Sequence, residues 1–95
     1  MTALQKFAQS EEFVDAVVSS TQAGFDGSGY SVEVFEDGTS RVLWDNQIGN
    51  RYESPGMIVR IPQLSAEEAE EGDLREVAEF YRDELAAQML DSASA

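Results

Sequence analysis

The side chains that could do chemistry in this 95-residue chain are nearly all carboxylates. Nineteen Asp and Glu residues stand against six Lys and Arg residues, which gives a net charge of −13, and the chain contains no histidine and no cysteine. Without cysteine there can be no thiol nucleophile, disulfide or zinc–thiolate site. Without histidine the usual proton shuttle at neutral pH is missing.

Carboxylate pairs can still act as acid and base, but only in a cleft that separates their pKa values. A domain this small offers little room for such a cleft. The sequence also lacks a phosphate-binding loop, a dinucleotide fingerprint and a nucleophile elbow. We therefore predict a protein that is not an enzyme and holds no cofactor.

The densest group of carboxylates runs from Glu67 to Glu84, where nine acidic residues stand against Arg75 and Arg82, a net charge of −7. As a single helix this stretch would be about 27 Å long. One net charge would then fall about every 4 Å, close to the ~3.4 Å spacing of phosphates along one nucleic-acid strand. The run fits docking on a basic partner, imitation of a nucleic acid, a solvated face that keeps the protein soluble, or adaptation to high salt.

The overall charge narrows the class of partner. A strongly negative field repels nucleic acids and anionic membrane surfaces and favours basic proteins. No apolar run is long enough to span a membrane, and residues 1–10 lack the apolar core of a signal peptide. We expect a soluble, cytoplasmic protein that binds neither nucleic acid nor membrane directly.

The link Asp26-Gly27-Ser28-Gly29-Tyr30 is similar to the middle of a calcium-binding loop. With Gly29 in the invariant glycine position of the EF-hand, position one would be Gly24 and position twelve Phe35, where carboxylates are required. The pattern therefore fails, and a flexible connection is the simpler interpretation. A small-ligand or divalent-ion site at this link remains a third hypothesis for function.

The carboxylates described above must be positioned by a few helices and strands. Helical periodicity covers residues 2–23, with Thr2 and Gln5 as a capping box, although Ser10-Glu11-Glu12 could begin a second helix. Residues 57–61 alternate as a strand. Ser65 begins a helical region that is interrupted at Gly72 and extends to about residue 90. We predict one domain, residues 1–90, followed by a frayed tail, residues 91–95.

The hairpin from Tyr30 to Trp44 has a register that can be argued from charge. Asp37-Gly38 is a strong turn signal, and a three-residue loop with Gly38 in the left-handed conformation pairs Glu33 with Arg41. A two-residue loop would instead place charges opposite apolar residues. We prefer the three-residue loop, and its core face is then formed by alternate positions of both strands: Tyr30, Val32, Val34, Val42 and Trp44.

The expected fold is a two-layer α+β domain of the order α-β-β-β-α, with both helical regions on one face of a three-stranded antiparallel meander. Residues 45–56 are either a long functional loop or a second hairpin with a turn at Gly49-Asn50. The opposite sheet face would present Phe35, Leu43, Tyr52 and Ile58, and a homodimer through this face is one expectation.

The favoured function is a small acidic regulatory or adaptor domain that binds a basic protein surface. The alternative is a nucleic-acid mimic that inhibits a DNA- or RNA-binding complex, as anti-CRISPR proteins do. The predicted partner-binding residues are Glu67, Glu68, Glu70, Glu71, Asp73, Glu76, Glu79, Phe35, Arg41, Leu43, Arg51 and Tyr52.

Overall fold

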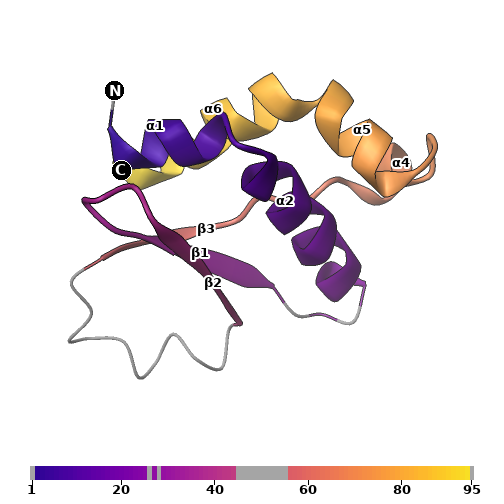
Figure 1. Ribbon diagram of the computed structural model, residues 1–95. Helices are drawn as coiled ribbons and strands as arrows, with labels where there is room; N and C mark the ends of the chain where they lie inside the picture. The colour runs from indigo at the N-terminus through magenta and orange to yellow at the C-terminus, as the bar shows by residue number, and fades with distance from the viewer. Residues whose placement is uncertain (1, 26, 28, 45–55, 95) are drawn as a thin grey trace.

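The computed structural model describes residues 2–25, 27, 29–44 and 56–94 (Figure 1). Its elements in chain order are α1 (Ala3–Ala8), α2 (Glu11–Gly24), β1 (Tyr30–Val34), β2 (Ser40–Trp44), β3 (Met57–Arg60), α4 (Ala66–Ala69), α5 (Leu74–Phe80) and α6 (Arg82–Ser94). The predicted mixed α+β class, with a three-stranded antiparallel sheet and a helical C-terminal region, is confirmed. Among the described residues, no helix combines the length and apolarity that crossing a lipid bilayer requires.

The N-terminal helical region is two helices, as the pattern at Ser10 allowed. Thr2 Oγ1 accepts a hydrogen bond from Gln5 N at 3.1 Å, and Thr2 N donates to Gln5 Oε1 at 2.8 Å, so the predicted capping box is present. Ser10 then takes the extended N-cap conformation of α2, and its hydroxyl donates to the carbonyl of Phe7 at 2.6 Å. Phe7 and Phe13 pack edge to face across this corner at a centroid distance of 5.9 Å.

The predicted hairpin register is confirmed pair by pair, from Tyr30 opposite Trp44 to Val34 opposite Ser40. Gly38 has φ +91°, as the three-residue loop requires. Asp37 Oδ1 accepts from both the backbone N–H and the hydroxyl of Thr39, at 2.9 and 2.6 Å. The turn is therefore fixed by local hydrogen bonds.

The strand order is β2-β1-β3, so the predicted meander is wrong. In a meander β2 would be central, whereas here β1 is central and pairs with both neighbours. The twelve-residue connection at positions 45–56 is long enough for β3 to pair with a strand other than β2. The consequence is that β2 is an edge strand.

This order decides which residues the helices cover. Helices α1 and α2 contact β1, and α6 contacts β3, on the side of the sheet seen above it in Figure 1. Val32 is fully buried there, but Val42, its partner across the ladder, is 40% exposed. The prediction that Val42 belongs to the core is therefore wrong, because the edge strand extends beyond the helices. The side chain of Trp44 lies outside the described residues.

The C-terminal region is divided into three helices. Ser65 and Glu68 form the predicted capping box of α4, and the Asp73 carboxylate caps α5 by accepting from the backbone N–H groups of Arg75 and Glu76. α5 ends at Phe80, with Tyr81 as its C-cap residue, and α6 extends to Ser94, past the predicted helix end near residue 90. The apolar stripe of this region is buried and completes the core with Val77, Ala78, Leu85 and Met89.

Candidate partner-binding surface

The carboxylates of the acidic stretch lie at the surface of the protein, and together we call them the acidic face. It consists of the carboxylates of α4, α5 and the start of α6: Glu67, Glu68, Glu70, Glu71, Asp73, Glu76, Glu79, Asp83 and Glu84. Glu68 is half-buried and the other eight residues are exposed. All seven carboxylates predicted as partner-binding residues thus lie at the surface.

The two arginines within the stretch bind other parts of the protein. Arg75 reaches α2, where its Nη2 lies 2.7 Å from Glu11 Oε2 and its Nη1 pairs with Asp15. Its Nε is also 3.7 Å from Glu79 Oε1. The hydrogen bond that Arg75 donates to Asp15, followed by the charge of that carboxylate, raises the pKa of Arg75 and keeps it protonated. This cation is therefore engaged by three carboxylates of the same molecule.

Arg82 serves the corner between α1 and α2. Its Nη2 donates to the carbonyl oxygens of Gln9 and Ser10, the latter at 3.2 Å, and its Nη1 is 4.0 Å from Glu11 Oε1. These carbonyls lie where α1 has ended and need donors from elsewhere in the fold. Arg82 thus ties α6 to the α1–α2 corner. Both arginines of the stretch therefore connect α5 and α6 to the N-terminal helices.

The carboxylates of the acidic face fall into two groups. In the first group, Glu68 and Asp73 accept backbone hydrogen bonds at helix N-termini, Glu71 accepts a hydrogen bond from the Tyr81 hydroxyl at 2.8 Å, and Glu79 pairs with Arg75. The second group forms no hydrogen bond or ion pair within the described part of the chain: Glu67, Glu70, Glu76, Asp83 and Glu84. These five negative charges are available to a partner.

Phe80 lies between Glu79 and Asp83 in the sequence and is 80% exposed, more than any other large hydrophobic side chain in the described ranges. Its ring packs edge to face on Tyr81 at a centroid distance of 4.9 Å and an interplanar angle of 87°. Sequence reasoning missed Phe80. The available signal was its position off the apolar stripe of the helix, which runs through Val77, Ala78 and Tyr81.

The Tyr81 hydroxyl is held in turn by the acidic face. It donates to Glu71, whose two carboxylate oxygens lie 2.8 and 3.2 Å away. This hydrogen bond, with smaller effects from burial and from the nearby charges of Glu71, Glu68 and Glu84, raises the pKa of Tyr81 above its usual value. Tyr81 therefore stays protonated at neutral pH and acts as a hydrogen-bond donor.

Of the binding residues predicted on the sheet, some are buried and others are exposed. Leu43 is only 2% exposed, so it does not present an apolar surface to a partner, contrary to the prediction. Arg41 is exposed at the edge strand, and its Nη2 lies 2.8 Å from Oε1 of the buried Glu33. Ile58 is half-buried. The homodimer through this face stays a prediction, without Leu43 as a contact. Arg51 and Tyr52 lie outside the described residues.

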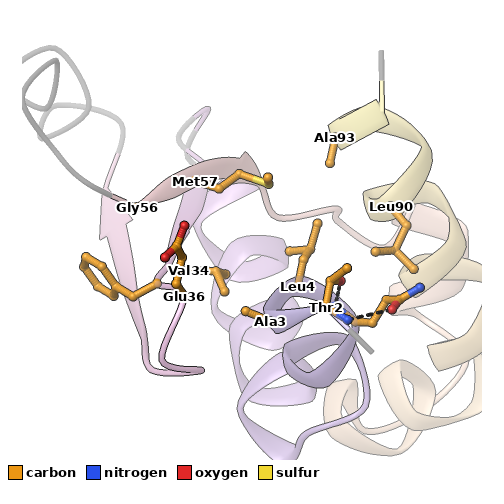
Figure 2. A pocket seen from close by; sticks show the side chains of 11 residues that line it. Thr2, Ala3, Leu4, Val34, Glu36, Gly56, Met57, Leu90 and Ala93 are labelled. Carbon is orange, nitrogen blue, oxygen red and sulfur yellow. Dashed lines mark hydrogen bonds between the residues drawn. The ribbon is translucent and has the colours of Figure 1, made fainter.

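Phe35 is half-buried and lines an open cavity of about 830 Å³ between α1, the hairpin end, the start of β3 and the end of α6 (Figure 2). Leu4, Val34 and Leu90 give its walls an apolar character, and Met57 at its rim is 54% exposed. Among the described residues that line it, Glu36 is the one with an ionisable side chain.

No group of three or more acidic residues with the geometry of a metal site occurs within the described ranges. Of the predicted ion-binding link, Asp26 and Ser28 lie outside those ranges, so that hypothesis stays a prediction. Comparison of the chain with protein-family models, with curated proteins and with solved structures gave no match.

Proposed function

We propose that this protein is a non-enzymatic regulatory or adaptor domain that docks through its acidic face on a basic surface of a partner protein. The observation that carries the proposal is that the positive charges of the acidic stretch are bound within the protein, whereas many of its negative charges are not. Arg75 and Arg82 are engaged with α1 and α2, while five carboxylates of the acidic face have no partner within the described part of the chain. A cytoplasmic location, which the lack of cysteine favours, is part of the proposal.

The same negative charge would also keep the protein soluble. Docking and solubility differ in whether the position of the carboxylates on the surface matters. Net charge opposes aggregation wherever it lies on the surface. Docking requires the charge to face the partner, where it speeds association and is screened by salt. The test must therefore change the position of the charges removed while keeping their number constant.

We would compare two double variants with equal net charge. E70Q/E76Q removes two unbonded carboxylates from the acidic face, and E36Q/D91N removes two exposed carboxylates elsewhere. Each variant and the wild type are used to capture proteins from lysate of the source organism at low and at high salt. We expect basic proteins that are bound by the wild type at low salt and released at high salt. They should be depleted by E70Q/E76Q and retained by E36Q/D91N. Equal capture by the two variants would contradict the proposal.

A nucleic-acid mimic is the second candidate, favoured by the density of charge between Glu67 and Glu84. The stretch is not the single helix from which that spacing was worked out, because it is interrupted between α4 and α5 and again at Tyr81. The mimic predicts that a captured partner binds nucleic acid and that duplex DNA or RNA displaces this protein from it. A captured partner with no affinity for nucleic acid would exclude the mimic and leave the docking proposal intact.

A further inference from the structure

The Phe80 ring is an exposed aromatic surface that packs on the ring of Tyr81. Its edge-to-face contact with Tyr81 and the bond from the Tyr81 hydroxyl to Glu71 hold the aromatic pair against the helix. An aromatic side chain that is 80% exposed forgoes the burial that its surface favours. Phe80 is thus presented to solvent by the fold and does not contribute to the core.

Two exposed carboxylates stand one helical turn before and after Phe80 in the sequence. Glu76 precedes Phe80 by four residues and Glu84 follows it by four, which are the spacings that bring side chains together on one side of a helix. The helical hydrogen bonds persist through the junction, because Tyr81 N bonds to Val77 O and Leu85 N bonds to Tyr81 O, each at 3.0 Å. Glu76 and Glu84 are both exposed.

An arginine side chain can contact both the exposed aromatic ring and the adjacent carboxylates. The guanidinium is planar and weakly hydrated, stacks on aromatic faces, and presents forked donors that match a carboxylate. A lysine ammonium can satisfy the charge, but it is a compact, strongly hydrated ion that combines the two contacts less well. An uncharged apolar segment would cover the ring and leave the adjacent carboxylates desolvated without partners.

We propose that Phe80, Glu76 and Glu84 form a subsite for an arginine side chain on an arginine-rich segment of the partner. This inference rests on the proposed function and specifies which basic chemistry the acidic face prefers. Charge complementarity selects the occupant, and the exposed ring selects arginine over lysine.

The probes are fluorescently labelled octa-arginine and octa-lysine peptides, which carry the same charge. Their affinities for the wild type are measured by fluorescence anisotropy at several salt concentrations. A cation–π contact at an exposed site corresponds to a preference for arginine of roughly 2–5-fold. We expect F80A to abolish that preference and F80L, which keeps apolar bulk without an aromatic face, to abolish it as well. The matched control is F25A, because Phe25 is also exposed, at 64%, and lies at the end of α2. It should keep the preference.

The outcomes separate the two proposals. Salt-sensitive binding of both peptides with equal affinity to the wild type would overturn the arginine subsite and leave the docking function standing. An arginine preference that survives in F80L would assign the contact to apolar packing and also overturn it. Loss of self-association in F80A by sedimentation analysis, without a change in the arginine preference, would assign Phe80 to a contact between copies of this chain. No salt-sensitive binding of either peptide would count against the docking function itself.

Discussion

The strand order can be tested by a pair of matched substitutions in one cross-strand pair. Val32 and Val42 face each other on the same side of the sheet, but Val32 is fully buried and Val42 is 40% exposed. Each Val→Ala change removes the same two methyl groups. If β1 is central and β2 is at the edge, the two variants must differ in stability, because only Val32 lies under the helices.

The expected magnitudes follow from burial. Two buried methyl groups are worth ~1.6 kcal/mol of transfer free energy at about 0.8 kcal/mol each. A cavity left under α1 and α2 adds to this by about 24 cal/mol per Å³. We therefore expect V32A to lower the free energy of unfolding by about 2–3 kcal/mol. At Val42 the transfer term is reduced by exposure and no closed cavity forms, so V42A should cost roughly 1 kcal/mol.

Urea unfolding followed by circular dichroism gives both values, with an unchanged m-value showing that only stability has changed. In thermal unfolding, roughly 4–8 °C per kcal/mol is expected for a domain of this size. V32A should therefore melt at least several degrees below V42A. A loss in V42A as large as or larger than the loss in V32A would mean that β2 lies under the helices as a central strand, as in a meander, and would contradict the order β2-β1-β3.

Three further predictions concern hydrogen bonds of the helical region. Thr21 Oγ1 accepts from the buried Leu64 N–H at 3.0 Å, so T21V should lower the free energy of unfolding in urea by about 1–3 kcal/mol; a loss near zero would contradict this. D73A should lower the free energy of unfolding by about 1 kcal/mol because it removes the N-cap of α5. D73N should keep most of that stability in the same assay, because asparagine is also a good N-cap residue. The raised pKa of Tyr81 stabilises the fold below the usual tyrosine pKa of about 10, and this contribution is lost as pH rises through the folded-state pKa. E71Q should move that pKa down in a phenolate absorbance titration, with Y81F identifying the signal, and an unchanged titration would contradict the role of Glu71.

The parts of the fold that were predictable from sequence are those fixed by nearby residues. The capping boxes at Thr2 and Ser65 each depend on side chains three residues apart. The hairpin register depends on the turn at Gly38 and on the pairing of Glu33 with Arg41. In each case an unsatisfied backbone group or a misplaced charge would penalise the alternatives.

The strand order was not predictable in this way, because it depends on which strand β3 joins. Both hairpin strands carry alternating patterns, and neither pattern marks a central strand. The residue that distinguishes β1 is Glu33, which is fully buried while paired with Arg41. A buried glutamate looks in sequence like an outward-facing one, so the composition of β1 pointed away from the central position that it occupies.

The candidate site was predicted as a charge run but not as a surface. Counting residues located the carboxylates between Glu67 and Glu84 correctly. It could not show that Arg75 and Arg82 bind α2 and the α1–α2 corner, since those contacts join positions more than sixty residues apart. It also overlooked Phe80, because the apolar stripe was read for the core and not for the side chain that departs from it.

The division of the acidic stretch into three helices explains how the fold tolerates so much negative charge. Like charges one turn apart destabilise a helix, but carboxylates in a first turn are stabilised by the N-terminal end of the helix dipole. Glu67 and Glu68 lie in the first turn of α4, Glu76 in that of α5, and Asp83 and Glu84 in that of α6. A single continuous helix would offer one capped N-terminus, whereas the interruption between α4 and α5 gives the stretch two, at Ser65 and Asp73. The interruption at Gly72 therefore lowers the cost of the charge without requiring cations on the outer surface. That leaves Arg75 and Arg82 to hold the helices together, and it leaves the outer carboxylates unneutralised for a basic partner.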